Sequence, residues 1–511
     1  MKNIQKNFLI FCVSLGAVIG AVVAYLNPAE KPLVGFFSAF LLSGLSLYVL
    51  GWLWHKLGGN RSLAWAVFIA FLLRLGIGML LFIALPAVGY DEDPTNAGYL
   101  YLDAYRRDSD AWRLAESGEP LVSAFQSEFA TDQYGGLLSL SAGVYRLFSP
   151  DGHRPLLILI LTSFAAAAGL PFLWQVVRKR FGEKTANVSA WLYALYPESV
   201  ILGASQMREP MLIGLSAVAA WGVSKWKDNK TRSLLALGIS FLLMLFFSGK
   251  AAGAVLAAMA VWFWLENIQP KAGKTWRIAG YLLLAIGILA GLYFSWSWLE
   301  DSSKWDLYLM ESSSGRIQWE VTLISDRLRV PFIVGYGIAQ PVLPAAIVYP
   351  GIPINRAIAI YRSLGWYLLA PLLVTSFLML WKEKSKENKG MLIYFLLAGL
   401  IWTLVSSARA GGDQWDNPRY RSIFLIWMLI PAAWAYVTTL QKRLPWLWRL
   451  IALEFIYIGF FIQWYLSRYY GLFKRMDFWP MIRLLGGIGF AIIFGGLAYD
   501  WARKKIREKR G

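Results

Sequence analysis

The sequence is short of the side chains that form disulfides and transition-metal sites. Its 511 residues include one cysteine, Cys12, and two histidines, His55 and His153. A single cysteine forms no disulfide within the chain, and a zinc centre needs more nitrogen or sulfur ligands than these residues supply. These shortages exclude a disulfide framework and a metal centre built on thiolates or imidazoles.

Charged residues are also few. Only 16% of the residues are charged, whereas 57% are hydrophobic and the mean hydropathy is +0.48. These values are typical of a polytopic membrane protein and exclude the soluble classes. The formal net charge is +19, but the basic residues stand in short runs beside apolar stretches. Such runs set the topology of membrane helices, so we expect no nucleic-acid partner.

Long apolar runs make up most of the chain, and they predict an all-α polytopic fold with about 14 transmembrane helices. About 20 apolar residues cross the hydrocarbon core of a membrane. The first run is too long for the core of a signal peptide, so we expect a retained anchor. The expected spans are 7–26, 34–54, 63–87, 154–177, 185–200, 209–225, 232–247, 250–267, 276–298, 362–381, 391–408, 422–438, 447–466 and 481–500.

The distribution of lysine and arginine predicts the orientation, because basic turns are retained on the cytoplasmic side. When the N-terminal MKNIQK is placed inside, all the strongly basic turns fall inside as well. They are HKLGGNR, VRKRFGEK, KWKDNKTR, KAGKTWR, WKEKSKENK, QKR and the tail ARKKIREKR. We therefore expect a multi-pass protein of the inner (plasma) membrane with both termini in the cytoplasm.

One long polar segment, 88–153, interrupts the apolar runs and falls on the outer side in this topology. Eleven of the 31 acidic residues lie in it, although the chain as a whole is basic. We expect this large first outer loop to carry two short helices, at 111–118 and 135–148, that lie along the membrane interface.

The apolar pattern divides the chain into four parts. Residues 1–62 form an N-terminal two-helix addition, and residues 63–300 form a core that carries the acidic outer loop. In the outer segment 301–361, five prolines and three glycines interrupt the stretch 331–361. We expect a re-entrant or surface-lying element there, because a straight helix does not tolerate that many prolines. Residues 362–511 supply the C-terminal transmembrane helices.

Three aspartates of the acidic loop are candidate catalytic residues, namely Asp103, Asp108 and Asp110. Closely spaced carboxylates beside a membrane act as a general base toward an incoming hydroxyl or amide, or bind a divalent cation through oxygen ligands. The alternative is a solvated acidic loop without a catalytic role.

Charges at or inside the membrane are the second group of candidates. Arg208 and Glu209 begin an expected span, and charges at such positions are costly unless they meet a partner. The helix dipole favours Glu209 there but not Arg208. The alternative is that Arg208 and Glu209 have a structural role and pair only with each other. Arg74, in the middle of the third span, requires an acidic or carbonyl partner inside the bundle.

Four basic residues lie on the predicted outer side, although basic residues of membrane proteins usually lie on the cytoplasmic side. They are Lys250, Arg409, Arg419 and Arg421. Arginine holds phosphate oxygens with two hydrogen bonds and lysine acts as a point charge, so together they suit a lipid-linked phosphate or diphosphate. The alternative is ordinary contact with anionic lipid headgroups.

Several local motifs occur in a characteristic order on the predicted outer side. The acidic loop contains DAY followed by AWRLAESG, and then YGGLLSLSAGVYRLFSPDGHRP. VVRKRFGEKTANVSAWLYALYPESVILGASQMRE follows, and NPRYRSIFL comes late in the chain. In this order the chain resembles the GT-C glycosyltransferases, most clearly over 100–260 and again over 405–435. That family includes protein mannosyltransferases and aminoarabinose transferases, and it uses polyprenyl-phosphate-linked sugars.

The resemblance implies sugar transfer from a polyprenyl-phosphate donor to a lipid, glycan or protein acceptor at the outer face. One of Asp103, Asp108 or Asp110 would deprotonate the acceptor, and Glu209 would assist it or join a site for a divalent cation. Two spans precede the one that corresponds to the first span of the family. The substrate-binding residues that we expect on this basis are Arg208, Lys250, Arg409, Arg419, Tyr420 and Arg421.

Two other functions fit parts of the pattern. A transporter or flippase of lipid-linked saccharide requires charged residues along a path through several spans, and Arg74 is the main charge of that kind. An O-antigen ligase or polymerase type of enzyme also uses outward arginines and a lipid diphosphate. Such an enzyme places its main outer loop late in the chain, whereas here it follows the third span.

Overall fold

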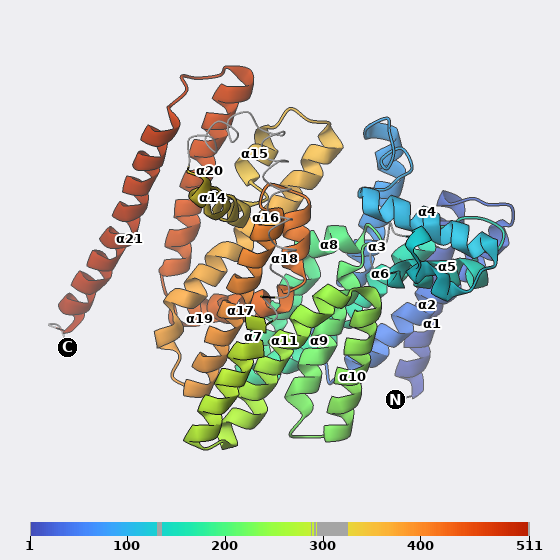
Figure 1. Cartoon of the computed structure of the whole chain (residues 1–511), viewed down its shortest axis with the longest axis horizontal. Coiled ribbons are helices and arrows are strands. Elements are labelled where there is room, and N and C mark those ends of the chain that lie inside the picture. The colour runs from blue at the N-terminus through green and yellow to red at the C-terminus, as the bar shows by residue number, and fades with distance from the viewer. Residues whose placement is uncertain (1, 130–134, 288, 291–292, 294–324, 509–511) are drawn as a thin grey trace.

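The computed structural model describes residues 2–129, 135–287, 289–290, 293 and 325–508, and these residues form helices and turns without a strand. Their long helices lie roughly side by side in a bundle (Figure 1). The helices of the first half are α1 (Lys2–Leu26), α2 (Pro32–Lys56), α3 (Arg61–Val88), α4 (Leu102–Ser117), α5 (Gly136–Phe148), α6 (Leu156–Ala168), α7 (Leu170–Leu195), α8 (Pro197–Gly203), α9 (Glu209–Lys225), α10 (Lys230–Phe247) and α11 (Gly249–Phe263).

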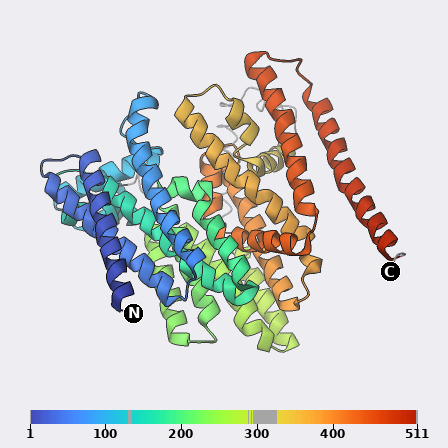
Figure 2. The same cartoon turned by 180° about the vertical axis from the view of Figure 1, so that it is seen from behind.

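The second half begins after a helix over 274–287. At one edge of the molecule α1 packs against α2, and the last two helices lie at the opposite edge, as Figure 2 shows from behind. The helices of this half are α14 (Asp326–Ala339), α15 (Leu343–Val348), α16 (Pro353–Leu378), α17 (Lys386–Ala410), α18 (Asp416–Ser422), α19 (Leu425–Lys442), α20 (Trp446–Tyr470) and α21 (Phe478–Glu508).

Ten helical segments of the described chain are long and apolar enough to cross a membrane, or up to eleven if the bent pair α18 and α19 forms one span. This confirms the all-helical polytopic fold, whereas the number fourteen stays a prediction. The expected span 209–225 is the 17-residue helix α9. The expected span 276–298 extends beyond the described residues.

The segment Leu156–Leu195 contains two of the expected spans, because the chain turns back at Gly182. Gly182 has φ 83° and ψ 171°, which a residue with a side chain rarely adopts. Across this turn the Trp174 indole donates to Asn187 Oδ1 at 2.8 Å, and the Tyr193 hydroxyl donates to the Ala166 carbonyl at 2.8 Å. The two arms therefore run antiparallel, as the expected spans 154–177 and 185–200 require.

Several of the long helices are preceded by a polar residue that caps their N-terminal end. A side-chain oxygen at the residue before the helix accepts a hydrogen bond from a backbone N–H of the first turn, which satisfies a donor that the helix leaves unpaired. The capping residues are Asn60 for α3, Asn229 for α10, Ser248 for α11 and Ser385 for α17.

The turns are sorted onto two ends of the bundle as the orientation rule predicts. Those expected inside are joined by hydrogen bonds of Asn60 to Glu183, Lys179 to Asp228, Lys227 to Glu266 and Lys442 to Lys382. Those expected outside are joined by hydrogen bonds of Lys31 to Asp151, Arg107 to Gln206, Arg362 to Glu198 and Arg419 to Asp103. Which end faces the cytoplasm stays a prediction.

The acidic loop contains the two expected helices, with one longer than predicted. α5 matches the expected 135–148, whereas α4 begins at Leu102 rather than at Ala111. α4 buries Ala104, Arg107, Asp108, Ala111 and Leu114. This spacing of three and four residues presents one face to the bundle. The Pro-rich stretch is broken into α14 and α15, and residues 353–361 begin the long helix α16.

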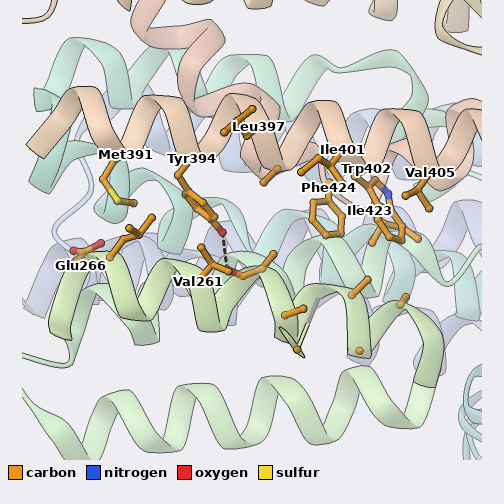
Figure 3. Close-up of a pocket in the computed structure, with 18 of the residues that line it drawn as sticks. Val261, Glu266, Met391, Tyr394, Leu397, Ile401, Trp402, Val405, Ile423 and Phe424 are labelled. Atoms are coloured by element: carbon orange, nitrogen blue, oxygen red, sulfur yellow. Dashed lines mark hydrogen bonds between the residues drawn. The ribbon is translucent and has the colours of Figure 1, made fainter. Parts of the chain in front are cut away.

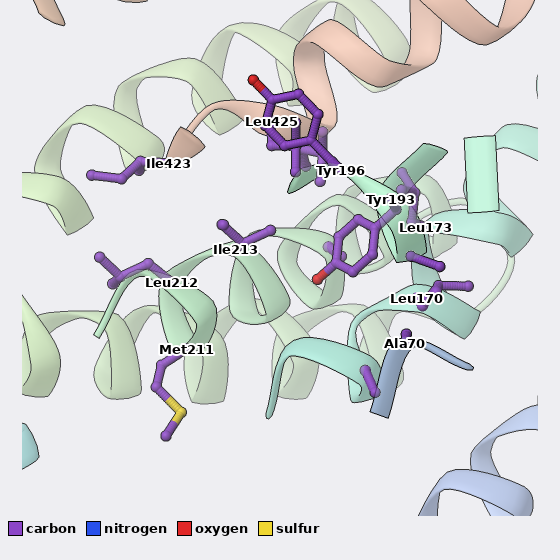
Figure 4. Close-up of a cluster of buried hydrophobic side chains, with 14 of the residues drawn as sticks. Ala70, Leu170, Leu173, Tyr193, Tyr196, Met211, Leu212, Ile213, Ile423 and Leu425 are labelled. Carbon is purple, nitrogen blue, oxygen red and sulfur yellow. The ribbon is translucent and has the colours of Figure 1, made fainter. Parts of the chain in front are cut away.

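The core surrounds the meeting point of α3, α7 and α9, where apolar side chains and tyrosine rings interlock (Figure 4). Arg74 is fully buried within it and donates to the carbonyls of Ala70, Tyr193 and Ala194 at 2.9 to 3.3 Å, and to Ser199 Oγ at 3.0 Å. The expected partner inside the bundle is therefore a set of carbonyls at the end of α7.

We expect Arg74→Met to destabilise the protein by roughly 3 kcal/mol, because it leaves buried carbonyls without a donor. The substitution keeps an apolar stem of similar length, so the loss reports the hydrogen bonds rather than a cavity. Thermal unfolding of the purified protein in detergent measures it. Arg61→Met is the matched control, because Arg61 is exposed at the start of the same helix. An equal loss in both variants would contradict the assignment.

Candidate functional site

A buried arginine joins three carboxylates from distant parts of the chain. Arg419 Nε lies 2.7 Å from Glu209 Oε1, and its Nη1 lies 2.8 Å from Asp103 Oδ2 and 3.3 Å from Asp416 Oδ1. We call these four residues the Arg419 cluster. Three of them are residues that the sequence predicts for the site, and the cluster brings the acidic loop next to the late RYR motif.

The helices that carry the cluster explain why its acids lie at this place. Asp103 is in the first turn of α4, and Glu209 is the first residue of α9. The N-terminal end of a helix carries partial positive charge, which favours a carboxylate there. Arg419 reaches both from the short helix α18, which is bent by 75° against α19. α18 thus brings Arg419 to the first turns of α4 and α9.

The cluster is closed on one side and open on the other. The side chains of Arg419 and Glu209 are 4% and 1% exposed, whereas that of Asp103 is 59% exposed. Glu209 Oε2 is buried and has no hydrogen-bond partner among the described residues. Burial acts to raise the pKa of Asp103, but the charge and hydrogen bond of Arg419 outweigh it, and the pKa is lowered. Asp103 therefore presents an ionised carboxylate to the solvent.

The positive charge among these carboxylates is the guanidinium of Arg419. Within the described part of the chain, no three or more His, Cys, Asp or Glu side chains are arranged to hold a metal ion. The divalent cation that the resemblance allows therefore has no such ligand set among the described residues.

A cavity of about 1580 Å³ begins beside the cluster and extends between α11 and α17. Figure 3 shows its apolar wall, to which Val261 contributes from α11 and Leu397 and Ile401 contribute from α17. Lys250 and Glu266 both line it and are 16 residues apart along α11 and its continuation, or about 24 Å at the helical rise per residue. The cavity is therefore nearly as long as a hydrocarbon core of about 30 Å is thick.

Three cations line the end of this cavity that adjoins the cluster, namely Arg208, Lys250 and Arg409. Arg208 caps α9 and Lys250 lies in the first turn of α11. Helix dipoles attract anions at such ends and disfavour cations. Two helix N-termini and three basic side chains thus face one space, and their electrostatic field there favours an anion.

Tyr420 connects this cationic end of the cavity to the Arg419 cluster. Its hydroxyl donates to Asp416 Oδ2 at 3.2 Å and accepts from Arg409 Nη2 at 3.2 Å. The guanidinium carbon of Arg409 also lies 4.5 Å from the centre of the Tyr420 ring. Tyr420 and Glu209 both line the cavity. The expected binding residues Arg208, Lys250, Arg409 and Tyr420 therefore lie together.

Two of the three candidate aspartates lie elsewhere. Asp108 is 2% exposed and accepts hydrogen bonds from the hydroxyls of Tyr99 and Tyr145 at 2.6 and 2.5 Å, and it lies 2.9 Å from His153 Nε2. This network joins α4 to α5. Asp110 lies 3.2 Å from Arg113 on the same helix. Of the three, Asp103 is the one that the structure places against Arg419.

Arg421 also lies apart from the cavity wall. Its Nη2 donates to the Gly337 carbonyl at 2.8 Å and to Asn417 Oδ1 at 2.9 Å, and its guanidinium carbon lies 3.9 Å from the centre of the Trp366 ring. These contacts hold α14 and α16 against α18. The structure thus gives Arg421 a packing role next to the site.

Sequence reasoning missed a second buried ion pair behind the cluster. Arg362 forms two hydrogen bonds to the Glu198 carboxylate, at 2.7 and 2.8 Å, and a third to the Trp415 carbonyl at 2.8 Å. Trp415 directly precedes Asp416, so this pair fixes the start of α18. Like the predicted outer cations, Arg362 lies on the predicted outer side, where basic residues are uncommon. This position is the sequence signal by which Arg362 could have been found. Asp416 was also missed.

Comparisons with family models, with curated proteins and with solved structures find no match for this chain. The geometry of the site and the sequence motifs are therefore the grounds for a function.

The pairing of Asp103 with Arg419 predicts how stability depends on pH. Because Arg419 lowers the pKa of Asp103 below 3.8, the pairing stabilises the fold fully above that pH. The contribution is lost as the pH falls through the lower folded value. We expect Asp103→Asn to cost about 1 kcal/mol or less at pH 7, because exposed pairs are weak, and to cost nothing at the acid limit.

Thermal unfolding of both proteins between pH 7 and pH 3 checks this. Asp110→Asn is the control, because Asp110 pairs with Arg113 on the same helix. A constant difference between wild type and the Asp103→Asn variant over the whole range would contradict the ion-pair explanation.

Proposed function

We propose that this protein is an integral-membrane glycosyltransferase that moves a sugar from a polyprenyl-phosphate-linked donor to an acceptor. The observation that carries the proposal is the junction of two environments. A long apolar cavity with three cations at its end meets an exposed carboxylate held by a buried arginine. A donor with a greasy tail and an anionic head fits the first environment, and a polar acceptor fits the second.

The cavity suits the donor in both charge and shape. A polyprenyl chain lies along apolar walls such as those of α11 and α17, and its phosphate reaches Arg208, Lys250 and Arg409. As the bond between the anomeric carbon and the phosphate oxygen breaks, the electron pair stays with the phosphate. Cations placed there in advance stabilise that charge. Tyr420 holds Arg409 toward this position.

Asp103 suits the acceptor. Its carboxylate is ionised and exposed, so it accepts a hydrogen bond from an acceptor hydroxyl or amide. A carboxylate with a lowered pKa is a weak base, so the proton moves late, when the acceptor atom has begun to bond to the anomeric carbon and has become acidic. Arg419 orients Asp103 during this step, and Glu209 and Asp416 keep Arg419 in place. The products are the glycosylated acceptor and polyprenyl phosphate.

The topology belongs to the same proposal. Fourteen spans, a cytoplasmic N-terminus and a cytoplasmic C-terminus place the Arg419 cluster at the outer face of the plasma membrane. The basic turns then lie inside, where the orientation rule puts them. The apolar walls of the cavity favour a lipid-binding enzyme over a flippase, because a flippase needs polar groups along the path of the headgroup.

We expect Asp103→Asn to lower kcat by about 100-fold or more, because the loss of a general base costs a factor of that order. The measurement is the release of polyprenyl phosphate from a panel of polyprenyl-phosphate hexoses and pentoses in vesicles. Asp110→Asn should retain full activity. If Asp103→Asn turns over at the rate of Asp110→Asn, the assignment of Asp103 as the base is wrong.

We expect Lys250→Ala and Arg409→Ala each to raise the KM for the donor about tenfold, since each removes a cation from the phosphate site, and to change the KM for the acceptor little. Initial rates at varied donor and acceptor concentrations measure both constants. Arg113→Ala is the matched control, because Arg113 is a basic residue of α4 with a side chain 57% exposed. A donor KM that stays at the wild-type value in both variants would rule out this phosphate site.

A further inference from the structure

The far end of the long cavity carries a second set of charged residues. Glu266 lies at this end in Figure 3, at the opposite end of the apolar wall from Trp402 and Val405. Four cations and two carboxylates line the cavity there, and they come from turns on the basic end of the bundle. They are Arg180, Lys227, Arg277, Lys386, Glu266 and Glu387.

A second cavity of about 260 Å³ adjoins the first at this end. Arg180, Lys227, Glu266 and Glu387 line both cavities. The small cavity adds Lys179, whose Nζ donates to the Ser224 carbonyl at 2.8 Å. A small chamber lined by five charged residues and several apolar ones thus shares a wall with the long apolar cavity. This is the shape of a lipid, with a compact polar head and a long tail.

The residues shared by the two cavities are held by specific contacts. Arg180, whose side chain is 20% exposed, approaches the Glu387 carbonyl at 3.5 Å and the Glu266 carboxylate at 3.9 Å. These contacts are long, so they leave the guanidinium able to take a closer anion. Lys227 Nζ donates to the Glu266 carbonyl at 2.7 Å. Glu266 lies in a π-helical turn, Trp264–Ile268, and such turns often mark functional sites.

We propose that this end of the large cavity, with the small chamber beside it, binds an anionic glycerophospholipid from the leaflet at the basic end of the bundle. The phosphate lies in the small chamber between Arg180 and Lys227, and an acyl chain lies along the apolar wall of the large cavity. Arginine and lysine recognise phosphate oxygens in this way, and basic pockets between membrane helices bind lipid headgroups. The headgroup site does not rest on the proposed function, although the acyl chain and the polyprenyl tail of the donor use the same apolar wall.

The two carboxylates favour a lipid over free phosphate. Glu266 and Glu387 line the same wall as Arg180 and Lys227, so they repel an anion with more than one charge. A phosphodiester carries one negative charge, whereas inorganic phosphate at neutral pH is a mixture of singly and doubly charged ions. The apolar wall also stabilises an acyl chain by about 0.8 kcal/mol for each buried methylene group, and free phosphate gains nothing from it.

Lipid binding to the full-length protein, purified in detergent and stripped of lipid, tests the proposal. Native mass spectrometry measures the bound fraction of phosphatidylglycerol and of phosphatidylcholine at equal concentrations. We expect the wild type to retain phosphatidylglycerol at least about fivefold better than phosphatidylcholine, and Arg180→Gln/Lys227→Gln to lose that preference. Arg232→Gln/Lys384→Gln removes the same charge from exposed positions of neighbouring basic turns and should keep the preference.

Three results would overturn the proposal. The first is an equal loss in the control variant, which would make the effect one of general surface charge. The second is equal retention of the two lipids by the wild type. The third is displacement of phosphatidylglycerol by millimolar inorganic phosphate, which would assign the chamber to free phosphate. If the double variant does not fold, Lys227→Gln alone keeps the test decisive, because Lys227 is exposed.

Discussion

The buried guanidinium of Arg419 is the constraint on which the site depends. A charged group at 4% exposure is stable only if nearby carboxylates and hydrogen bonds replace its hydration. Glu209 and Asp103 supply them, and both lie in the first turn of a helix, so α4, α9 and α18 must meet at one point. The position of the acidic loop over the bundle follows from this requirement. If one partner is removed, the others are left with an unbalanced charge.

A second buried arginine fixes the chain that carries the first. Arg362 donates a hydrogen bond to the Trp415 carbonyl. Asp413 Oδ1 accepts hydrogen bonds from the backbone N–H groups of Trp415 and Asp416, at 2.6 and 3.1 Å. The turn before α18 is therefore held by a hydrogen bond from α16 and by hydrogen bonds within the turn itself. Such support limits the motion of Arg419 and of the Asp103 carboxylate that it holds.

The sequence predicts the membrane helices and the sorting of turns because both depend on local composition. Apolar length and basic runs are visible without knowledge of tertiary contacts. It also predicts that Asp103, Glu209 and Arg419 share a site, but it does not separate Asp103 from Asp108. That choice depends on which face of α4 each occupies, and α4 begins nine residues earlier than its apolar pattern indicates. Glu198 and Arg362 pair across 164 positions, and no local pattern reveals such a partner.

Asp103 and Asp108 differ in how much room each carboxylate leaves for a further partner. Both have a lowered pKa, and burial opposes the shift in each. Asp108 has its oxygens occupied by Tyr99, Tyr145 and His153 and is 2% exposed. Asp103 forms an ion pair with Arg419, and 59% of its side chain is exposed to solvent. Asp108 therefore has no room for a further partner and joins its neighbouring helices, whereas Asp103 has a fixed position and an open face, as its proposed role as a base requires.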